Sequence, residues 1–158
     1  MKLMNTDTQY GSVARFFHWT IVLLIVNQFV VGVLMMWMRR GASMPGISPL
    51  SLITWHKSMG LLVLMLVIGR FAWRHATKLP SWPEGMRKWE ESAIRFIEGG
   101  LYAVLFIMPA AGMMLSTAGG HGVSFFGLFT IPGFTTPNIS LSSIGWFLHV
   151  LTSYAIAG

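Results

Sequence analysis

Three histidines occur inside long apolar segments of the sequence, where an imidazole side chain is unusual: His18, His56 and His149. Ionisable side chains at membrane depth are rare, usually face neighbouring helices, and are functional by default. A neutral imidazole can bind a metal ion, take part in proton transfer, or only donate a hydrogen bond to the backbone of another helix. The other two histidines, His75 and His121, fall outside the apolar segments, and we expect both to be solvated.

The composition indicates a membrane protein rather than a soluble one. Of the 158 residues 54% are hydrophobic and only 10% are charged, whereas a soluble domain has about 25% charged residues. The absence of cysteine excludes disulfides, zinc fingers and cysteine-ligated iron–sulfur clusters. The net charge of +6 comes from basic residues scattered between apolar segments. This pattern is typical of membrane topology signals and does not indicate nucleic-acid binding.

Four apolar segments are long enough to cross a bilayer, which takes about 20 residues. They cover residues 16–38, 50–73, 93–118 and 139–158, and we expect the last span to continue beyond residue 158. The first is too long for the apolar part of a cleaved signal peptide. Pro109 lies within the third span and is expected to kink it. The sequence therefore predicts an all-α, integral membrane four-helix bundle formed by a single domain, residues 1–158.

The distribution of basic residues predicts the orientation of this bundle. Eight of the eleven lysines and arginines fall in the N-terminal segment or around the connection between the second and third spans, and three lie on the other side. By the positive-inside rule, both termini and this middle connection face the cytoplasm. His18 then lies near the cytoplasmic face, whereas His56 and His149 both lie toward the outer face.

Small and cationic residues occur at positions related to these histidines. Residues fourteen apart share one helix face and lie about 21 Å apart along it. Gly32 follows His18 at this spacing, and Arg70 follows His56. Each helix face then offers a histidine at one depth and a small or cationic residue at the other. Such a face suits a flat, wide ligand such as a porphyrin, because small residues allow close approach to a helix.

Two further glycines and a second arginine fit the same arrangement. Gly60 and Gly145 each lie one turn from a histidine within a span. Arg15 and Arg70 lie near the cytoplasmic level, where a guanidinium can pair with a carboxylate such as a haem propionate. Taken singly, these residues are better explained by helix packing and lipid-headgroup anchoring. Together with the histidines, they favour a haem site.

Each span carries a sequence motif around its polar residues. The motifs are RFFHW in the first span, WHKSMGLLVLMLVIGRFAWR in the second, LYAVLFIMPAAG in the third and FLHVLTSYAIAG in the fourth. Together and in this order, they resemble the bacterial cytochrome b561 family over essentially the whole chain. The resemblance implies a multi-pass protein of the bacterial inner (plasma) membrane, with two b-type haems, one near each face, each bound by two histidines. The family includes b subunits that anchor hydrogenases or dehydrogenases.

Carried over to this sequence, the resemblance implies that His56 and His149 bind the iron of the outer haem and that His18 binds the inner one. The other candidate haem-binding residues are Arg15, Gly32, Gly60, Arg70 and Gly145. Relatives complete the inner haem with a second histidine roughly four turns after His149. That position would fall beyond Gly158, so the inner haem lacks a second ligand in this chain. We expect the natural chain to continue past this residue.

A second departure from the family concerns the third span. Many relatives have a histidine four residues before the tyrosine of the third motif. Glu98 stands at that place relative to Tyr102. The resemblance therefore assigns no histidine role in the third span of this chain.

The implied cofactor suggests the function. Iron bound by two histidines has no open position for oxygen, which favours one-electron transfer. The resemblance therefore implies electron transfer between membrane quinone (ubiquinone or menaquinone) and a periplasmic or membrane redox partner or small redox substrate at the outer face. Superoxide oxidation that feeds quinone is an alternative within the family. Membrane lipid surrounds the protein, a homodimer is left open, and no catalytic residue is assigned.

Two functions of other classes remain open at this point. In a small transporter, the histidines would be proton or metal-ion sites, although the spans lack the acidic residues that such sites commonly use. A passive membrane anchor without a cofactor would leave His149, in the middle of a span, unexplained. The visible absorption spectrum of the purified protein separates these hypotheses.

Overall fold

The computed structural model describes residues 2–157, which form four long helices and a short hairpin. The elements in chain order are α1 (Ser12–Arg39), α2 (Pro49–Ala76), α3 (Lys88–Ala118), β1 (Val123–Phe125), β2 (Phe129–Ile131) and α4 (Ile139–Ala157). All four helices are long and apolar enough to cross a membrane. The predicted all-α, four-helix membrane architecture is confirmed.

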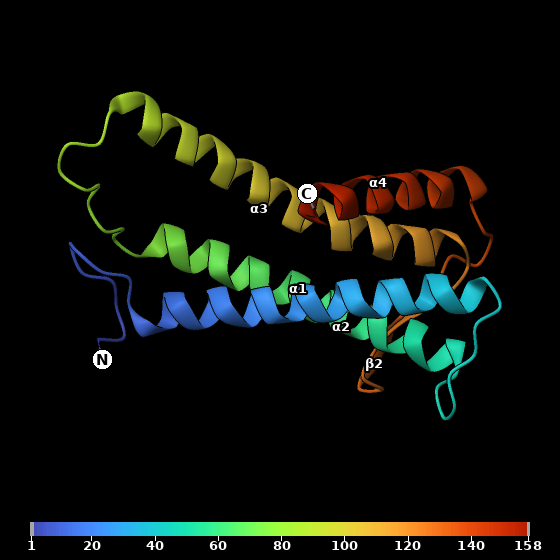
Figure 1. The fold of residues 1–158 in the computed structure, drawn as a ribbon. Helices are drawn as coiled ribbons and strands as arrows, with labels where there is room; N and C mark the ends of the chain where they lie inside the picture. Colours follow the sequence, from blue (N-terminus) through green and yellow to red (C-terminus); the bar gives the residue numbers. More distant parts are fainter. Residues whose placement is uncertain (1, 158) are drawn as a thin grey trace.

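Helices that follow each other in the chain pack together: α1 against α2, α2 against α3, and α3 against α4. Figure 1 shows that α4 lies beside the half of α3 that leads into the hairpin, whereas the first half of α3 stands apart from it. The N-terminal segment and the connection between α2 and α3 lie at one end of the molecule (Figure 1). The hairpin and the start of α4 lie toward the other end.

Local sequence signals determine where the helices begin. The Ser48 hydroxyl accepts the Ser51 N–H at 3.0 Å and so caps α2. Pro49 occupies the first turn of α2, where a missing N–H does no harm. Glu90 accepts the Arg87 N–H at 2.8 Å at the start of α3. These contacts satisfy backbone groups that a helix terminus leaves without a partner.

The end of α2 differs from the predicted span. The helix continues to Ala76, so His75 lies in its last turn and not past its end. The His75 Nδ1–H donates to the Phe71 carbonyl at 2.8 Å, because a helical residue one turn earlier offers a carbonyl within reach. The side chain is exposed, as expected, and so is that of His121 between α3 and β1.

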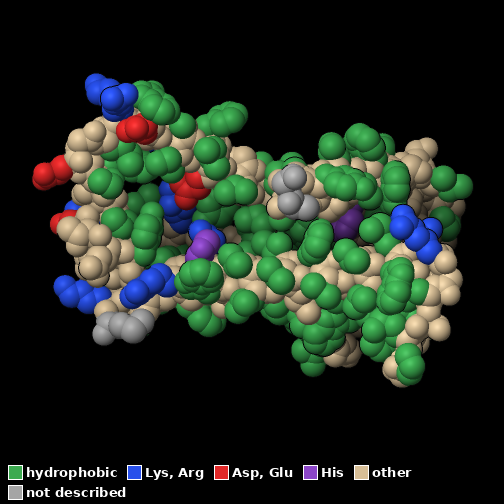
Figure 2. Space-filling model, in the orientation of Figure 1, with side chains coloured by type: hydrophobic (Ala, Val, Ile, Leu, Met, Phe, Trp, Pro, Cys, Tyr) green, Lys and Arg blue, Asp and Glu red, His purple; other side chains and the backbone are tan. Residues whose placement is uncertain are grey.

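The buried core of the bundle is small. Ile21, Val63 and Val67 are each at most 2% exposed, and they pack against apolar side chains of α1, α2 and α3. Large hydrophobic side chains such as Leu23 and Phe147 are instead 67% and 57% exposed. Figure 2 shows hydrophobic side chains along most of the visible surface. Such a surface suits contact with lipid, whereas a soluble monomer rarely exposes so large an apolar area.

The uncharged connection between α3 and α4 forms a β-hairpin that the sequence did not predict. The turn between β1 and β2 has positive φ at Phe126 (49°) and Gly127 (76°), which is the backbone of a type I′ turn. Ser58 of α2 is 1% exposed. Its hydroxyl donates to the Ser124 carbonyl at 2.9 Å and accepts the Phe126 N–H at 3.1 Å. The hairpin is thereby fixed to α2 two residues after His56.

Residues 2–11 fold back over the end of the molecule that holds the α2–α3 connection, and we call them the N-terminal strap. Asn5 accepts the Gly11 N–H at 2.9 Å and donates to the Lys78 carbonyl at 2.9 Å. The Asp7 carboxylate pairs with the Lys78 ammonium at 2.5 Å, and the Asp7 carbonyl accepts the Ser81 N–H at 2.8 Å. The hydrogen bond and the charge of Lys78 lower the pKa of the Asp7 carboxyl.

Candidate functional site

Two of the span histidines meet between α2 and α4. The ring centroids of His56 and His149 are 6.0 Å apart, and the ring planes lie at 83° to each other. Because a metal–imidazole nitrogen bond is about 2.0 Å long, an iron between two imidazoles needs ring centroids about 6 Å apart. The observed separation is therefore compatible with one iron atom between the two rings.

A hydrogen bond determines which nitrogen of His149 is free. Its Nδ1 lies 2.8 Å from the Met108 carbonyl oxygen of α3, and because a carbonyl only accepts, Nδ1 carries the proton. The Nε2 lone pair is then available to a metal ion. Metal-ligating histidines usually have their second nitrogen held in this way. His149 therefore has the tautomer that an iron ligand requires.

Gly112 makes room for the His149 ring. A side chain at this position would place its Cβ 2.9 Å from Nδ1 and 3.0 Å from Cε1 of His149. Sequence reasoning assigned neither Gly112 nor Met108 to the site. The signal for Gly112 was nevertheless present, because this glycine ends the Pro-x-x-Gly element of the third motif. Met108 contributes its backbone carbonyl, and a contact made by the backbone cannot be predicted from the residue type.

His56 has a different environment from His149. Its Nδ1 atom is buried and has no hydrogen-bond partner within residues 2–157. The backbone carbonyl of His56 accepts a hydrogen bond from Gln28 Nε2 of α1 at 2.9 Å. A pair of neighbouring imidazoles, one with its Nε2 free and one with a buried nitrogen still unpaired, fits a bis-histidine iron site such as that of haem b.

The third span histidine, His18, lies in a separate cavity of about 320 Å³ at the strap end of the bundle. Arg70 Nη1 donates to His18 Nδ1 at 3.1 Å, because a guanidinium has no acceptor. A neutral His18 ring therefore carries its proton on Nε2, the opposite tautomer to His149. In the described part of the chain, this cavity is lined by one histidine, so the structure shows one candidate ligand here.

Hydrogen-bond donors dominate the walls of this cavity. Its polar lining residues include Asn5, Arg15, Arg70, Trp73, Arg74 and Glu98. Arg74 and Glu98 pair with each other at 2.5 Å, and the buried Trp73 Nε1 has no hydrogen-bond partner among residues 2–157. Arg70 donates to His18, and the exposed Arg15 guanidinium and the Trp73 indole N–H are further donors at this cavity. The cavity therefore fits the carboxylates of haem propionates.

The glycines proposed from spacing have three different environments. A Cβ at Gly32 would meet nothing within 4 Å, so α1 faces open space there. A Cβ at Gly60 would lie 3.2 Å from Gln28 Nε2, so Gly60 leaves room for this amide. A Cβ at Gly145 would lie 2.6 Å from the Leu115 nitrogen of α3. Gly145 therefore allows α4 to approach α3 closely, which holds His149 near Met108.

The two sites lie toward opposite ends of the bundle. His56 and His149 belong to the end that carries the hairpin, whereas Arg15, His18 and Arg70 share the cavity under the N-terminal strap. Figure 2 shows that lysine and arginine side chains gather at the strap end. The structure thus brings the predicted residues together as an outer pair and an inner group.

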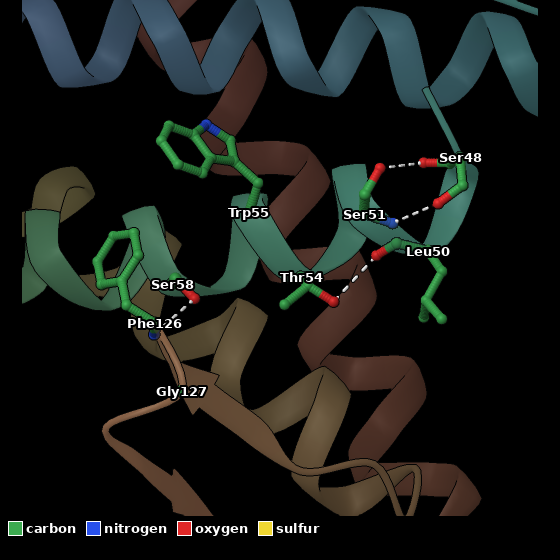
Figure 3. Close-up of a pocket in the computed structure, with 8 residues that line it drawn as sticks. All are labelled: Ser48, Leu50, Ser51, Thr54, Trp55, Ser58, Phe126 and Gly127. Carbon is green, nitrogen blue, oxygen red and sulfur yellow. Dashed lines mark hydrogen bonds between the residues drawn. The ribbon is translucent and has the colours of Figure 1, made fainter. Parts of the chain in front are cut away.

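A groove of about 400 Å³ lies next to the His56 end of α2. Hydroxyl groups of the start of α2 and the aromatic rings of Trp55 and Phe126 line it, and the two rings meet edge-on with centroids 6.0 Å apart. Figure 3 shows that Ser48, Ser51 and Thr54 hydrogen-bond within the first turns of the helix, whereas Ser58 binds the hairpin backbone. The groove is therefore an amphipathic surface one residue from His56.

Comparison with known proteins identifies the family of the chain. Residues 9–158 match the family described as prokaryotic cytochrome b561. The chain is also 24% identical over 163 residues to cytochrome b561 homolog 2 of Escherichia coli, a match that covers 99% of this chain and 81% of the relative. The family match includes all four helices and confirms the resemblance seen in the sequence. The chain belongs to the prokaryotic cytochrome b561 family.

Proposed function

We propose that this protein passes single electrons between membrane quinone and a redox partner or small redox substrate at the outer face of the membrane. As a member of its family, it is a multi-pass bacterial membrane protein and a haem b cytochrome for electron transfer. When bound, haem b supplies reversible one-electron chemistry at its iron.

The observation that carries the proposal is the pair formed by His56 and His149. Their ring centroids lie 6.0 Å apart, which is compatible with one iron between two imidazoles, so both residues would be ligands of a haem iron. Iron bound by two histidines would have no open position for oxygen, which favours electron transfer. The Met108 carbonyl keeps the His149 proton on Nδ1 and so leaves Nε2 unprotonated for a metal ion.

The cavity under the strap supports a second, inner haem with His18 as one ligand. His18 would bind iron through Nε2 only with its proton on Nδ1, so Arg70 must then donate to another acceptor. A propionate carboxylate is such an acceptor, and Arg15 and Trp73 line the same cavity as further donors. Glu98 does not compete for Arg70, because it pairs with Arg74.

The groove beside His56 supports electron exchange at the outer face. Its aromatic walls and hydroxyl groups suit a flat molecule with polar substituents, such as a quinone ring or another small redox substrate. Trp55 and Ser58 line the groove and flank His56 in sequence. Because neighbouring residues of a helix point in different directions, the α2 backbone would lie between a substrate in the groove and the outer histidine pair.

The visible absorption spectrum of the purified protein tests the proposal. We expect the dithionite-reduced protein to show the sharp bands of low-spin b haem, and a His56→Ala variant to lose the band of the outer haem. The exposed His75→Ala variant is the control and should keep the parent spectrum. A fully folded protein that binds no haem when haem is supplied would refute the proposal.

Oxidation of superoxide is a second candidate, favoured by the position of Lys57. This lysine adjoins His56, and its Nζ donates to the Gly122 carbonyl at 3.2 Å, so a cation lies near the outer site and attracts an anionic substrate. Each superoxide would give up one electron and leave as oxygen, and two electrons with two protons would convert a quinone to quinol. Quinol formation driven by a superoxide source, and slowed in Lys57→Gln, tests this candidate.

A further inference from the structure

Gln28 is a buried amide in the middle of a membrane-spanning helix. It is 8% exposed, and its Nε2 donates to the His56 carbonyl of α2 at 2.9 Å. Its Oε1 is buried and has no hydrogen-bond partner within residues 2–157. A buried polar atom without a partner is rare in folded proteins and calls for an explanation. The hydrogen bond to His56 therefore involves the Nε2 group of the Gln28 amide and leaves its Oε1 atom unpaired.

The residue whose carbonyl Gln28 contacts also has an unpaired side-chain nitrogen, which is a donor when it carries the ring proton. His56 Nδ1 is also buried and also lacks a partner within the described residues. The other histidines for which a hydrogen bond is present at Nδ1 use a carbonyl or a guanidinium: Met108 for His149, Phe71 for His75 and Arg70 for His18. A metal-ligating imidazole needs an acceptor for its second N–H. At His56 the backbone does not supply one.

We propose that Gln28 is a positioning residue for His56, and that its Oε1 accepts the Nδ1–H of His56, directly or through one buried water. One residue then has a free acceptor and the other a free donor, and the two residues already contact each other through the Gln28 Nε2 bond. This pairing fixes the His56 tautomer that leaves Nε2 for the iron. The proposal rests on the proposed function, since it takes His56 as an iron ligand.

Gly60 belongs to the same arrangement. Its missing Cβ would lie 3.2 Å from Gln28 Nε2, so a glycine at this position gives the amide space between α1 and α2. The Gln28 amide, which contacts the His56 backbone, therefore explains why a glycine lies one turn after His56. A side chain here would press on Gln28 and disturb both of its hydrogen-bonding groups.

The acceptor strength at Nδ1 controls how basic the ligating Nε2 is, and a more basic imidazole stabilises ferric iron. Gln28→Leu removes the acceptor and should raise the midpoint potential of the outer haem, with haem affinity about 10- to 100-fold lower. Gln28→Glu keeps the shape and strengthens the acceptor, so it should lower the potential. The rise in Gln28→Leu is the specific sign of the lost acceptor, because the carboxylate of Gln28→Glu also lowers the potential through its charge.

Asn27 provides a matched control one residue away. Its Oδ1 accepts the Trp55 Nε1–H at 3.2 Å, so Asn27→Leu also removes a hydrogen bond between α1 and α2, but not one that reaches the His56 ring. Redox titration of the purified holoprotein would compare the parent with Gln28→Leu, Gln28→Glu and Asn27→Leu. Asn27→Leu should leave the potential unchanged.

Equal potentials in the parent, Gln28→Leu and Gln28→Glu would overturn the positioning role, as would an equal shift in Asn27→Leu. If Gln28→Leu fails to fold or to retain haem, the neutral and polar Gln28→Asn, one methylene shorter, replaces it, and a raised or an unchanged potential decides. Failure of the proposed function has a different signature. The parent then contains no low-spin haem, or that haem survives in His56→Ala, and either result also removes the basis for the role of Gln28.

Discussion

The three span histidines differ in what their Nδ1 atoms contact, and this difference determines what each ring can bind. At His149 the Met108 carbonyl takes the Nδ1 proton, whereas at His18 Arg70 donates to Nδ1. His149 is therefore set to bind iron through Nε2 without rearrangement. His18 must first exchange its tautomer and release Arg70, so we expect the inner site to lose its ligand more readily than the outer one.

At the residue scale, the outer histidines should act as one unit. His56→Ala or His149→Ala removes one of two axial ligands, and we expect the outer haem to become high-spin or to be lost. The double variant should be little worse than either single variant, because one ligand alone does not maintain the low-spin state. Electron paramagnetic resonance of the three variants measures this. A low-spin bis-imidazole signal that survives in the double variant would remove both residues from the site.

Gly112 offers a second test at this scale. Gly112→Ala would place a methyl group 2.9 Å from His149 Nδ1, so the ring must move or the hydrogen bond to Met108 must break. We expect an altered outer-haem spectrum and a loss of about 1–3 kcal/mol in stability, as in other overpacked sites. Gly100→Ala is the control on the same helix, because nothing lies within 4 Å of its Cβ position. Equal effects of the two substitutions would contradict a specific role for Gly112.

Residue type and depth predicted which histidines are candidates, but not their partners. An apolar segment with one imidazole identifies His56 and His149, because a polar group within a span needs a reason. The contacts of Gln28 and Gly112 depend on the rotation of each helix about its axis. The spans are apolar on all sides, so no periodic pattern reveals that rotation. The role of Gly145 also depends on rotation, and its contact with the α3 backbone became visible only in the structure.

At the element scale, the N-terminal strap should show a pH-dependent closure. Lys78 lowers the pKa of Asp7 below its ordinary value of 3.8 through a hydrogen bond and its charge. The ion pair therefore favours the closed strap above that pH and loses its effect as the pH falls through the lowered folded-state pKa. Both side chains are mostly exposed, so the effect is small and screened by salt.

Hydrogen exchange at the Ser81 amide, which donates to the Asp7 carbonyl, measures strap closure once intrinsic rates are corrected. We expect protection in the parent to fall at acidic pH, and Asp7→Asn to abolish this fall. Asn5→Ala should reduce the protection of the Ser81 amide at every pH. The Asn5 amide does not titrate, and it bonds backbone groups of Gly11 and Lys78. An unchanged acid response in Asp7→Asn would show that another group controls the strap.

The helices were predictable as elements and the hairpin was not. A span needs only length and low polarity, and all four apolar segments satisfy both. β1 and β2 have three residues each, too few for an alternating pattern to be recognised, and two contacts of Ser58 with their connecting backbone fix them to α2. The strap was likewise visible in the sequence only as a polar leader, because its closure depends on residues of the distant α2–α3 connection.

At the scale of the whole molecule, the charge distribution predicts the membrane orientation. The strap and the α2–α3 connection lie at one end, where lysine and arginine side chains gather (Figures 1 and 2). By the positive-inside rule we expect that end to lie in the cytoplasm, and the hairpin with the outer histidine pair to face the periplasm. This orientation decides which site exchanges electrons with an external partner.

The absence of cysteine from the sequence allows a clean test with single-cysteine variants. His121→Cys and Glu84→Cys introduce exposed thiols at the hairpin end and in the α2–α3 connection, respectively. In cells with a permeabilised outer membrane, we expect a membrane-impermeant maleimide to label the first variant, and the second only after the inner membrane is disrupted. The cysteine-free parent controls for background. Labelling in the reverse order would mean that the molecule has the opposite membrane orientation. His56 and His149 would then lie at the cytoplasmic face, and His18 would lie on the side of the external partner.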